Sequence, residues 1–314
     1  MTTRSDRALV VGCGGTLGFA WTTAVLDSLA AEWAPASADL LIGTSAGAEA
    51  VAMLGAGIRP AAILGALTRS AEADPVVAAH ARYVPGRRPP VPFPWLPAAG
   101  LVAAGVRGEV DLLAGLAGAL PRGRGDATWL RRLGDSLASR EGWVRHPATW
   151  LMATDPRGRR VAFGAPGAPS ARLGDALAAS WAIPGWFPPV EIGGTRYLDG
   201  GVVSPTSADL VLGHDVAEVV VIAPMSSEGG APARGATRLE RLLRTAMTRR
   251  VDGEVRRLRA VGVRVVRIEP GAEDLAAMGA NFMDPRHRER VLAVARETAP
   301  RRVARAFERD GTTA

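Results

Sequence analysis

Apolar runs alternate along this chain with stretches whose apolar positions recur at helical spacing. The run 8–11 is continuously apolar, as in a strand that is buried on both faces of a sheet. A helical pattern follows over 19–31, then a second strand pattern over 39–42 and a second helical pattern over 48–54. This order predicts a parallel sheet that is covered by helices.

The later part of the chain continues the alternation. It predicts helices over 126–137, 173–181, 237–260 and 289–307, and strands over 148–153, 159–163, 218–223 and 263–268. A turn at 155–158 makes 159–163 the predicted hairpin partner of 148–153. We find no internal repeat and no linker between autonomous halves, so we expect a single domain over 1–314.

The stretch 74–108 is predicted to be irregular, because its many prolines suit neither helix nor sheet interiors. Two interpretations of it stay open. With Phe93, Trp95 and Leu96 it would form an apolar flap over a site, or it is a surface excursion without function.

The composition indicates a globular chain. Of 314 residues, 47% are hydrophobic and 22% charged, which allows a large core and excludes intrinsic disorder. No apolar run reaches the roughly 20 residues of a membrane span. We expect no signal peptide, because the N-terminus leads directly into a strand, and the single cysteine, Cys13, excludes an internal disulfide. A cytoplasmic protein is therefore expected, with peripheral membrane contact left open.

The net charge of +7 comes entirely from arginine. Five arginines would share one side of the helix predicted over 237–260: Arg238, Arg241, Arg249, Arg256 and Arg259. Such a face suits anionic lipid head groups, although compositional drift over solvated surfaces explains the same excess. A nucleic-acid partner is not expected, because there is no aromatic interleaving and no nucleic-acid motif.

Ser45 stands in Gly43-Thr44-Ser45-Ala46-Gly47, between a predicted strand and a predicted helix. In that setting a G-x-S-x-G segment forms a strained elbow that exposes the serine hydroxyl at the end of a sheet. Gly43 and Gly47 remove the Cβ atoms that would collide there, and the helix N-terminus adds a positive dipole end. We interpret Ser45 as a nucleophile, although the same residues also occur in plain turns.

A nucleophilic serine needs a site for negative charge on the substrate oxygen. The glycine-rich turn 12–18, after the first strand, can aim successive backbone N–H groups into one concavity. A dinucleotide site is the rival interpretation, but it requires an acidic residue at the end of the second strand. That position holds 43–45 instead, so we favour an oxyanion site.

The serine also needs a base. None of the histidines (His80, His146, His214 and His287) lies in a motif that suggests an orienting partner. Asp199 follows a short strand and precedes two glycines, so its carboxylate can approach a serine hydroxyl. On its own, Asp-Gly-Gly is more often an ordinary turn, because Asp and Gly favour turns for local reasons.

Together these segments resemble the patatin-like phospholipase family. Residues 43–47 match the nucleophile motif of that family, 179–190 resemble its A-S-x-x-I-P-x-x-F-P-P block, and 197–205 resemble the block with the catalytic aspartate. The turn 12–18 corresponds to its G-G-G-x-R/K-G element. The matches run in the family's order from about residue 8 to 211.

The resemblance implies an α/β fold, a three-layer α/β/α sandwich with a mostly parallel central sheet. In this arrangement 8–211 is the catalytic core and 212–314 completes the same domain. It also implies a serine acyl hydrolase, a phospholipase A or esterase, that cleaves phospholipid or neutral glycerolipid esters through an acyl-enzyme. No cofactor and no metal is implied.

Carried over by position, the resemblance makes Ser45 the nucleophile and Asp199 the base of a dyad without histidine. Gly14, Gly15 and Thr16 would donate backbone N–H groups to the oxyanion.

Two positions depart from the family pattern. Cys13 replaces the first glycine of the family's glycine-rich element, and Leu17 replaces its Arg/Lys. Loss of that cation weakens the phospholipid assignment more than the hydrolase assignment, because the proposed oxyanion donors are main-chain groups.

Two further hypotheses remain. An α/β-hydrolase triad would use His214 or His287, but its elbow normally follows several strands, and here it follows the second. The other hypothesis is a catalytically weak lipid-binding or regulatory protein on the same fold. It stays open because Leu17 replaces the cation of the family element.

Overall fold

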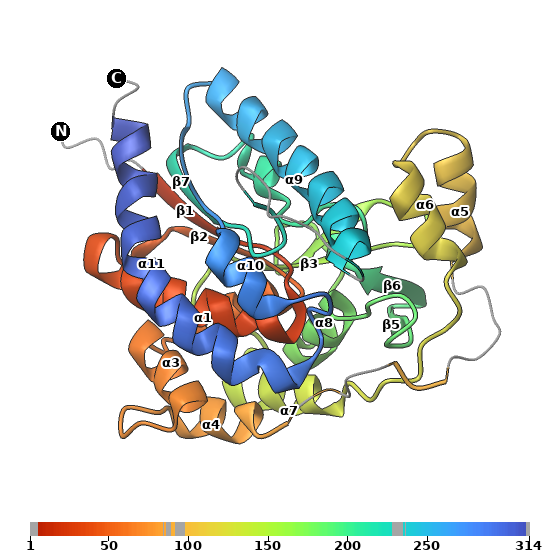
Figure 1. Ribbon diagram of the computed structural model, residues 1–314. Coiled ribbons are helices and arrows are strands. Elements are labelled where there is room, and N and C mark those ends of the chain that lie inside the picture. Colours follow the sequence, from red (N-terminus) through yellow and green to blue (C-terminus); the bar gives the residue numbers. More distant parts are fainter. Residues whose placement is uncertain are drawn as a thin grey trace.

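The computed structural model describes residues 6–83, 85, 89–91, 98–227, 235 and 237–311. A central sheet carries helices on both faces (Figure 1). Within the described residues this sheet has eight strands in the order β5–β6–β3–β2–β1–β7–β8, and β4 pairs with β3 outside that path.

The middle of the sheet is parallel, as predicted. The parallel strands are β1 (Asp6–Val11), β2 (Leu40–Thr44), β3 (Thr149–Thr154), β7 (Val216–Ile222) and β8 (Arg264–Ile268).

Antiparallel strands complete one side of the sheet. They are β4 (Arg160–Phe163), β5 (Val190–Ile192) and β6 (Thr195–Asp199). The pairing of β4 with β3 confirms the predicted hairpin.

Each face of the sheet has its own apolar core, because the central strands are buried on both sides. Leu9 and Val11 of β1 point into one core with α1, α2, α8 and α11, whereas Ala8 and Val10 point into a second core with α9 and η3. The three-layer α/β/α architecture with a mostly parallel sheet is therefore confirmed.

The helices of the described residues are α1 (Gly15–Glu32), α2 (Ala46–Gly55), α3 (Pro60–Thr68), α4 (Pro75–Ala81), α5 (Ala99–Val106), α6 (Leu112–Ala119), α7 (Thr128–Leu137), α8 (Leu173–Ser180), α9 (Thr237–Ala260), α10 (Ala272–Met278) and α11 (Arg288–Gly311). Short 3-10 turns are η1 (Pro35–Ser37), η2 (Gly200–Val202), η3 (Ala208–Val211) and η4 (Pro285–His287). Among the predicted elements there is no counterpart of α3, α4, α5, α6 or α10.

The expectation of irregular structure over 74–108 was wrong at both ends. At one end α4 begins with Pro75, and Asp74 caps it by accepting from the next two N–H groups at 2.9 and 3.1 Å. Proline suits that first turn because its missing N–H has no helical acceptor. At the other end α5 follows the last proline. The flap residues Phe93, Trp95 and Leu96 lie outside the described residues.

Strands β7 and β8 follow residue 212 in sequence and extend the sheet beyond β1. The division into a core over 8–211 and a completing part over 212–314 stays a prediction.

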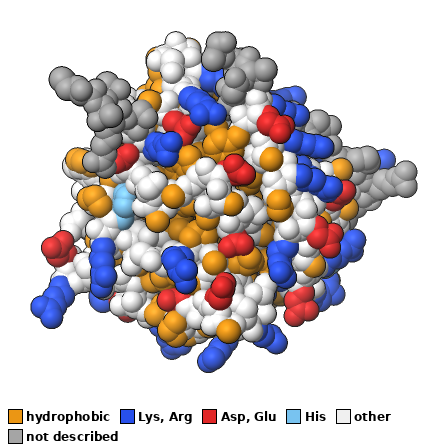
Figure 2. All heavy atoms as spheres, turned by 90° about the vertical axis from the view of Figure 1, so that its left-hand side faces the viewer, with side chains coloured by type: hydrophobic (Ala, Val, Ile, Leu, Met, Phe, Trp, Pro, Cys, Tyr) orange, Lys and Arg blue, Asp and Glu red, His pale blue; other side chains and the backbone are white. Residues whose placement is uncertain are grey.

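Figure 2 shows the side of the molecule that lies at the left of Figure 1, where apolar side chains occupy the middle and charged ones surround them. No helix in the described ranges combines the length and apolar character needed to cross a membrane.

Candidate active site

The register of β1 and β2 brings two turns together at one edge of the sheet. Val11, at the end of β1, lies opposite Gly43 in the parallel pair, so α1 and α2 both begin at that edge. A Cβ on Gly47 would lie 2.0 Å from the carbonyl oxygen of Val11 and 2.8 Å from that of Gly12. The glycine-rich turn and the serine elbow are therefore in direct contact.

The same edge receives Asp199 through β3. Thr44 lies opposite Met152 in the parallel pair of β2 and β3, and the antiparallel β6 places Asp199 opposite Ala153. Ser45 follows Thr44 directly, so two residues far apart in the chain end at the same level of the sheet.

Ser45 has the strained backbone expected of an elbow. Its φ is 56° and its ψ is −118°, a region that residues with a side chain rarely adopt. A Cβ on Gly43 would lie 2.4 Å from Val51, so no side chain fits at that flank. The elbow amide is held from another element, because the N–H of Ser45 donates to Ser180 Oγ at 2.8 Å.

Ser180 belongs to the 179–190 block, to which the sequence analysis gives no part in the site. It is the last residue of α8 and is fully buried. An acceptor at this position fixes the turn that carries Ser45.

Asp199 ends β6 and is 4% exposed. One carboxylate oxygen, Oδ1, accepts from the N–H of Gly201 at 2.7 Å. Burial raises the pKa of Asp199 from 3.8 to about 7, against the lowering by hydrogen bonds from the Ser45 hydroxyl and the Gly201 amide.

The Ser45 hydroxyl is thus close enough to Asp199 to favour the charged form of the Asp199 carboxyl. Oδ2 of Asp199 is buried, and no donor in the described part of the chain reaches it with well-aligned geometry. Such contacts are often loose before substrate binds. One carboxylate oxygen remains available to receive a proton.

The turn between β1 and α1 carries amides without a helical acceptor. Gly14 is the N-cap of α1, and Gly15 and Thr16 are its first residues. No backbone carbonyl among the described residues accepts from these three amides. Free N–H groups at the positive end of a helix are suited to bind an oxyanion.

Two segments clamp this turn. A Cβ on Gly14 would lie 2.9 Å from Pro224, and one on Gly15, whose φ is +57°, would lie 2.6 Å from the ring of Phe282. The N–H of Leu17 donates to the carbonyl of Phe282 at 3.0 Å. The segments after β7 and α10 therefore fix the direction of the amides.

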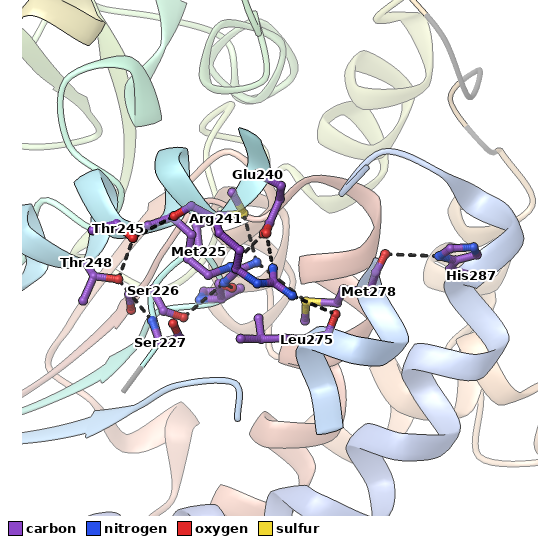
Figure 3. A network of polar contacts seen from close by, with 12 residues as sticks. Met225, Ser226, Ser227, Glu240, Arg241, Thr245, Thr248, Leu275, Met278 and His287 are labelled. Carbon is purple, nitrogen blue, oxygen red and sulfur yellow. Dashed lines mark hydrogen bonds and ion pairs between the residues drawn. The ribbon is translucent and has the colours of Figure 1, made fainter. Parts of the chain in front are cut away.

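A polar network on α9 supports the Pro224 segment (Figure 3). Arg244 is fully buried and donates to the carbonyls of Pro224 and Ser226 at 2.6 and 3.1 Å. It also pairs with Glu240, one helical turn earlier, at 2.8 Å. This arginine is therefore structural, and nothing in the charge pattern of the sequence distinguishes it from the other arginines of the helix.

The prediction of one basic face on α9 was wrong for Arg241. Its side chain is 13% exposed, pairs with Glu240 and donates to the carbonyl of Leu275 in α10. Figure 3 shows Arg241 and Glu240 beside Leu275. Arg249 and Arg256 are exposed, as that face requires.

The two departures from the family pattern are both buried. Leu17 is fully buried and its side chain is uncharged, so this position of α1 brings no cation to the site. Burial and the charge of Asp199 raise the pKa of Cys13, more than the charges of Arg250 and Arg244 lower it. The thiol stays protonated, and α9 rather than α1 brings positive charge near the turn.

The loop after Asp199 is tied to α9 as well. Glu254 is buried and accepts from the hydroxyls of Ser204 and Thr206 and from the N–H of Ala208. The signal in the sequence that could have identified Glu254 is its acidic side chain in an arginine-rich helix. Glu254 holds the segment that carries the candidate base.

His80 has an orienting partner that no motif in the sequence indicates. Its Nε2 lies 2.5 Å from Glu49, both side chains are buried, and its ring stacks on Trp129. Within the described ranges, no hydrogen bond joins His80 to Ser45 or Asp199.

Among the described residues, no hydrogen bond joins either histidine of the triad alternative to Ser45 or Asp199. His214 packs against Trp150, near the start of β3, whereas Ser45 follows the end of β2. His287 Nδ1 lies 3.1 Å from the carbonyl of Met278 (Figure 3). Neither position favours a triad with Ser45.

The described residues also line a cavity that does not include Ser45 or Asp199. This cavity of about 1070 Å³ lies beside β8, α9 and α11, and two of its arginines, Arg264 and Arg267, pair with acidic side chains. No group of His, Cys, Asp and Glu in the described part is placed to hold a metal ion.

Comparisons with known proteins agree with the resemblance. Residues 9–212 match the family described as patatin-like phospholipase. Two solved structures are similar: VipD from Legionella pneumophila (14% identity, TM-score 0.45, covering 96% of this chain and 67% of VipD) and the type III effector protein ExoU (16% identity, TM-score 0.40, covering 96% of this chain and 53% of ExoU). No curated protein matches the chain. Because the family match covers more than half of its length, the chain belongs to the patatin-like phospholipase family.

Proposed function

We propose that this chain is a serine acyl hydrolase that cleaves lipid carboxylic esters through an acyl-enzyme on Ser45, with Asp199 as the base. Family membership supports lipid ester hydrolysis in general. The finer proposal depends on one observation, the strand register that brings Ser45 and the buried Asp199 to the same level of the sheet, where the Ser45 hydroxyl favours the charged carboxylate.

In the first half of the reaction, Ser45 Oγ attacks the ester carbonyl carbon, and its proton passes to Asp199. The carbonyl oxygen gains negative charge, which the amides of Gly14, Gly15 and Thr16 stabilise. The bond between the carbonyl carbon and the alcohol oxygen then breaks. The alcohol leaves with the proton from Asp199, and the acyl group remains on Ser45.

In the second half, a water molecule attacks the acyl carbon and gives a proton to Asp199. The bond to Ser45 Oγ breaks, Oγ recovers the proton, and the fatty acid leaves. Because Asp199 alternately accepts and donates the proton, a pKa of about 7 suits both halves near neutral pH.

The substrate class follows from the family and from the charges near the turn. With Leu17 buried, no cation from α1 meets a head-group phosphate. Either a neutral glycerolipid or a phospholipid whose phosphate meets Arg250 of α9 is compatible with this arrangement.

A turnover panel tests the proposal. Wild type and Ser45→Ala are assayed with p-nitrophenyl esters and with diacyl phospholipids. We expect the wild type to release fatty acid and Ser45→Ala to lose at least about 10⁴-fold in turnover. A folded wild type that turns over none of these esters but binds them would instead support the lipid-binding alternative.

A further inference from the structure

Helices α5 and α6 form a hairpin that projects from the body of the molecule (Figure 1). Its outer surface carries large apolar side chains, exposed as follows: Val106 83%, Leu112 71%, Leu116 54% and Leu120 45%. Leu112 and Leu116 lie one helical turn apart on α6, and Leu120 directly follows the helix as its C-cap. We call Leu112, Leu116 and Leu120 the α6 stripe.

The interior of the hairpin contains small residues instead. A Cβ on Gly105 would lie 2.7 Å from the Cα of Gly115, and one on Gly118 would lie 2.8 Å from the carbonyl of Ala98. The two backbones therefore approach closely, and the side chains of Leu112 and Leu116 on α6 are left outside. A helical hairpin in water usually has the reverse arrangement, whereas small residues between helices are typical of packing in lipid.

Charged residues of the hairpin are confined to the connection between the helices. Arg107 pairs with Glu109 there, and Asp111 pairs with Arg250 of α9. The α6 stripe itself contains no charge that would oppose burial in an apolar medium.

The base of the hairpin rests on the segment that carries Asp199. Leu101 of α5 shares a small core with Leu198, and Val110 and Val202 pack against that core. Leu198 directly precedes Asp199, and Val202 lies in the turn after it. The hairpin that carries the α6 stripe is therefore packed directly on the segment of the candidate base.

We propose that the α5–α6 hairpin docks this protein on an anionic lipid surface, with the α6 stripe buried at the level of the head groups. This inference rests on the proposed function, because docking would bring the substrate to Ser45. A helix of eight residues is about 12 Å long and cannot cross the roughly 30 Å apolar core of a bilayer. We infer that α6 lies flat in the interface.

Charge favours a lipid surface over a second copy of the chain. Arg122 and Arg124 are exposed just after the stripe, while Gly123 between them packs against Trp186. Arg249 is exposed beside Arg250. These cations complement anionic head groups, whereas a second copy, with its own net charge of +7, would bring like charges together.

The test measures binding to vesicles in a Ser45→Ala background, so that no lipid is consumed. Vesicles of phosphatidylcholine with added phosphatidylglycerol are compared with pure phosphatidylcholine by cosedimentation. The double variant Leu112→Ser/Leu116→Ser is compared with Val261→Ser, a matched control that changes a residue 65% exposed after the end of α9. Thermal unfolding by circular dichroism checks that each variant is folded.

We expect the double variant to lose at least about tenfold in partitioning, since a buried leucine side chain contributes enough for that change. The control should stay within about twofold, and added salt should weaken binding of the parent protein. When Leu112→Ser/Leu116→Ser is made in the protein that retains Ser45, hydrolysis of vesicle lipid should fall more, relative to the wild type, than hydrolysis of a short ester dissolved as monomers.

Three results would overturn the docking inference: no binding of the parent protein to anionic vesicles, equal binding by the double variant, or equal loss in the control. A dimer that the double variant dissociates, without any change in vesicle binding, would assign the stripe to a second copy. If the protein with Ser45 hydrolyses no ester, the proposed function fails, but the vesicle comparison still decides the docking.

Discussion

Asp199 is the residue at which chemistry and stability conflict. Its carboxyl is almost fully buried, and burial raises its pKa to about 7 although Ser45 and Gly201 favour the charged form. A base with a pKa near the working pH is well matched to proton transfer. Ionisation inside the protein, however, opposes folding.

The first prediction concerns the pH dependence of activity. Asp199 acts as a base only when ionised, so kcat/KM for a soluble ester should rise as the pH passes upward through about 7. The measurement is a pH–rate profile on a p-nitrophenyl ester, corrected for spontaneous hydrolysis. A profile that is flat over about one pH unit on either side of 7 would remove Asp199 from this role.

The second prediction concerns stability. Between pH 3.8 and about 7, Asp199 holds a proton in the folded state but not in the unfolded state, so its contribution to stability falls as the pH rises through this window. A shift of about three pKa units corresponds to an upper bound of about 4 kcal/mol. Asp199→Asn should therefore raise the free energy of unfolding, and more at pH 8 than at pH 5, while abolishing ester turnover.

Chemical denaturation at both pH values measures this difference. An Asp199→Asn protein that is less stable than the wild type at the higher pH would show that the carboxylate is stabilised rather than strained by its surroundings.

At the scale of elements, the site depends on how closely β1 and the β2–α2 elbow approach each other. The third prediction uses Gly47, where a Cβ would lie 2.0 Å from a backbone oxygen that no rotamer change can move. Gly47→Ala should cost at least about 3 kcal/mol or abolish folding. Gly253→Ala is the matched control, because the nearest atoms there are the ends of arginine side chains at 3.8 Å or more.

In the control, alanine replaces glycine inside α9 and should stabilise the protein by about 0.5–1 kcal/mol. Urea denaturation of the two variants decides the comparison. Equal stability of Gly47→Ala and the wild type would mean that the two turns do not touch as described.

The fourth prediction separates structural from superficial arginines on α9. Arg244→Leu leaves the carbonyls of Pro224 and Ser226 without this donor and Glu240 without its buried partner. We expect a loss of about 3–5 kcal/mol in the free energy of unfolding. The exposed Arg249→Leu should change it by less than about 0.5 kcal/mol. Similar losses in both variants, measured by denaturation, would contradict the network in Figure 3.

At the scale of the whole molecule, the sequence predicted the sheet better than the helices. Continuous apolar runs such as 8–11 identify strands buried on both faces, and the structure has them as parallel neighbours. Helix α6 was missed because Leu112–Ala119 is apolar all round and shows no polar face to mark its period. Helix α4 was missed because the prolines from Pro85 onward made the whole stretch from residue 74 look irregular, although Asp74 and Pro75 are typical of a helix start.

The parts of the site that were missed are long-range. Local sequence could suggest an elbow at Ser45 and a turn at Asp199, because glycines mark both. It could not show that Ser180 accepts from the elbow amide or that Glu254 holds the loop after Asp199. Those contacts exist only once α8 and α9 are packed on the sheet, and the resemblance to a family carried the pairing of the two candidate catalytic residues.

Labelling with a fluorophosphonate, read by intact mass and peptide mapping, is the most direct test of Ser45 as the nucleophile. We expect one adduct on the wild type at Ser45, slower labelling of Asp199→Asn and none of Ser45→Ala. An adduct that persists in folded Ser45→Ala, or a folded wild type that does not react, would contradict this role of Ser45.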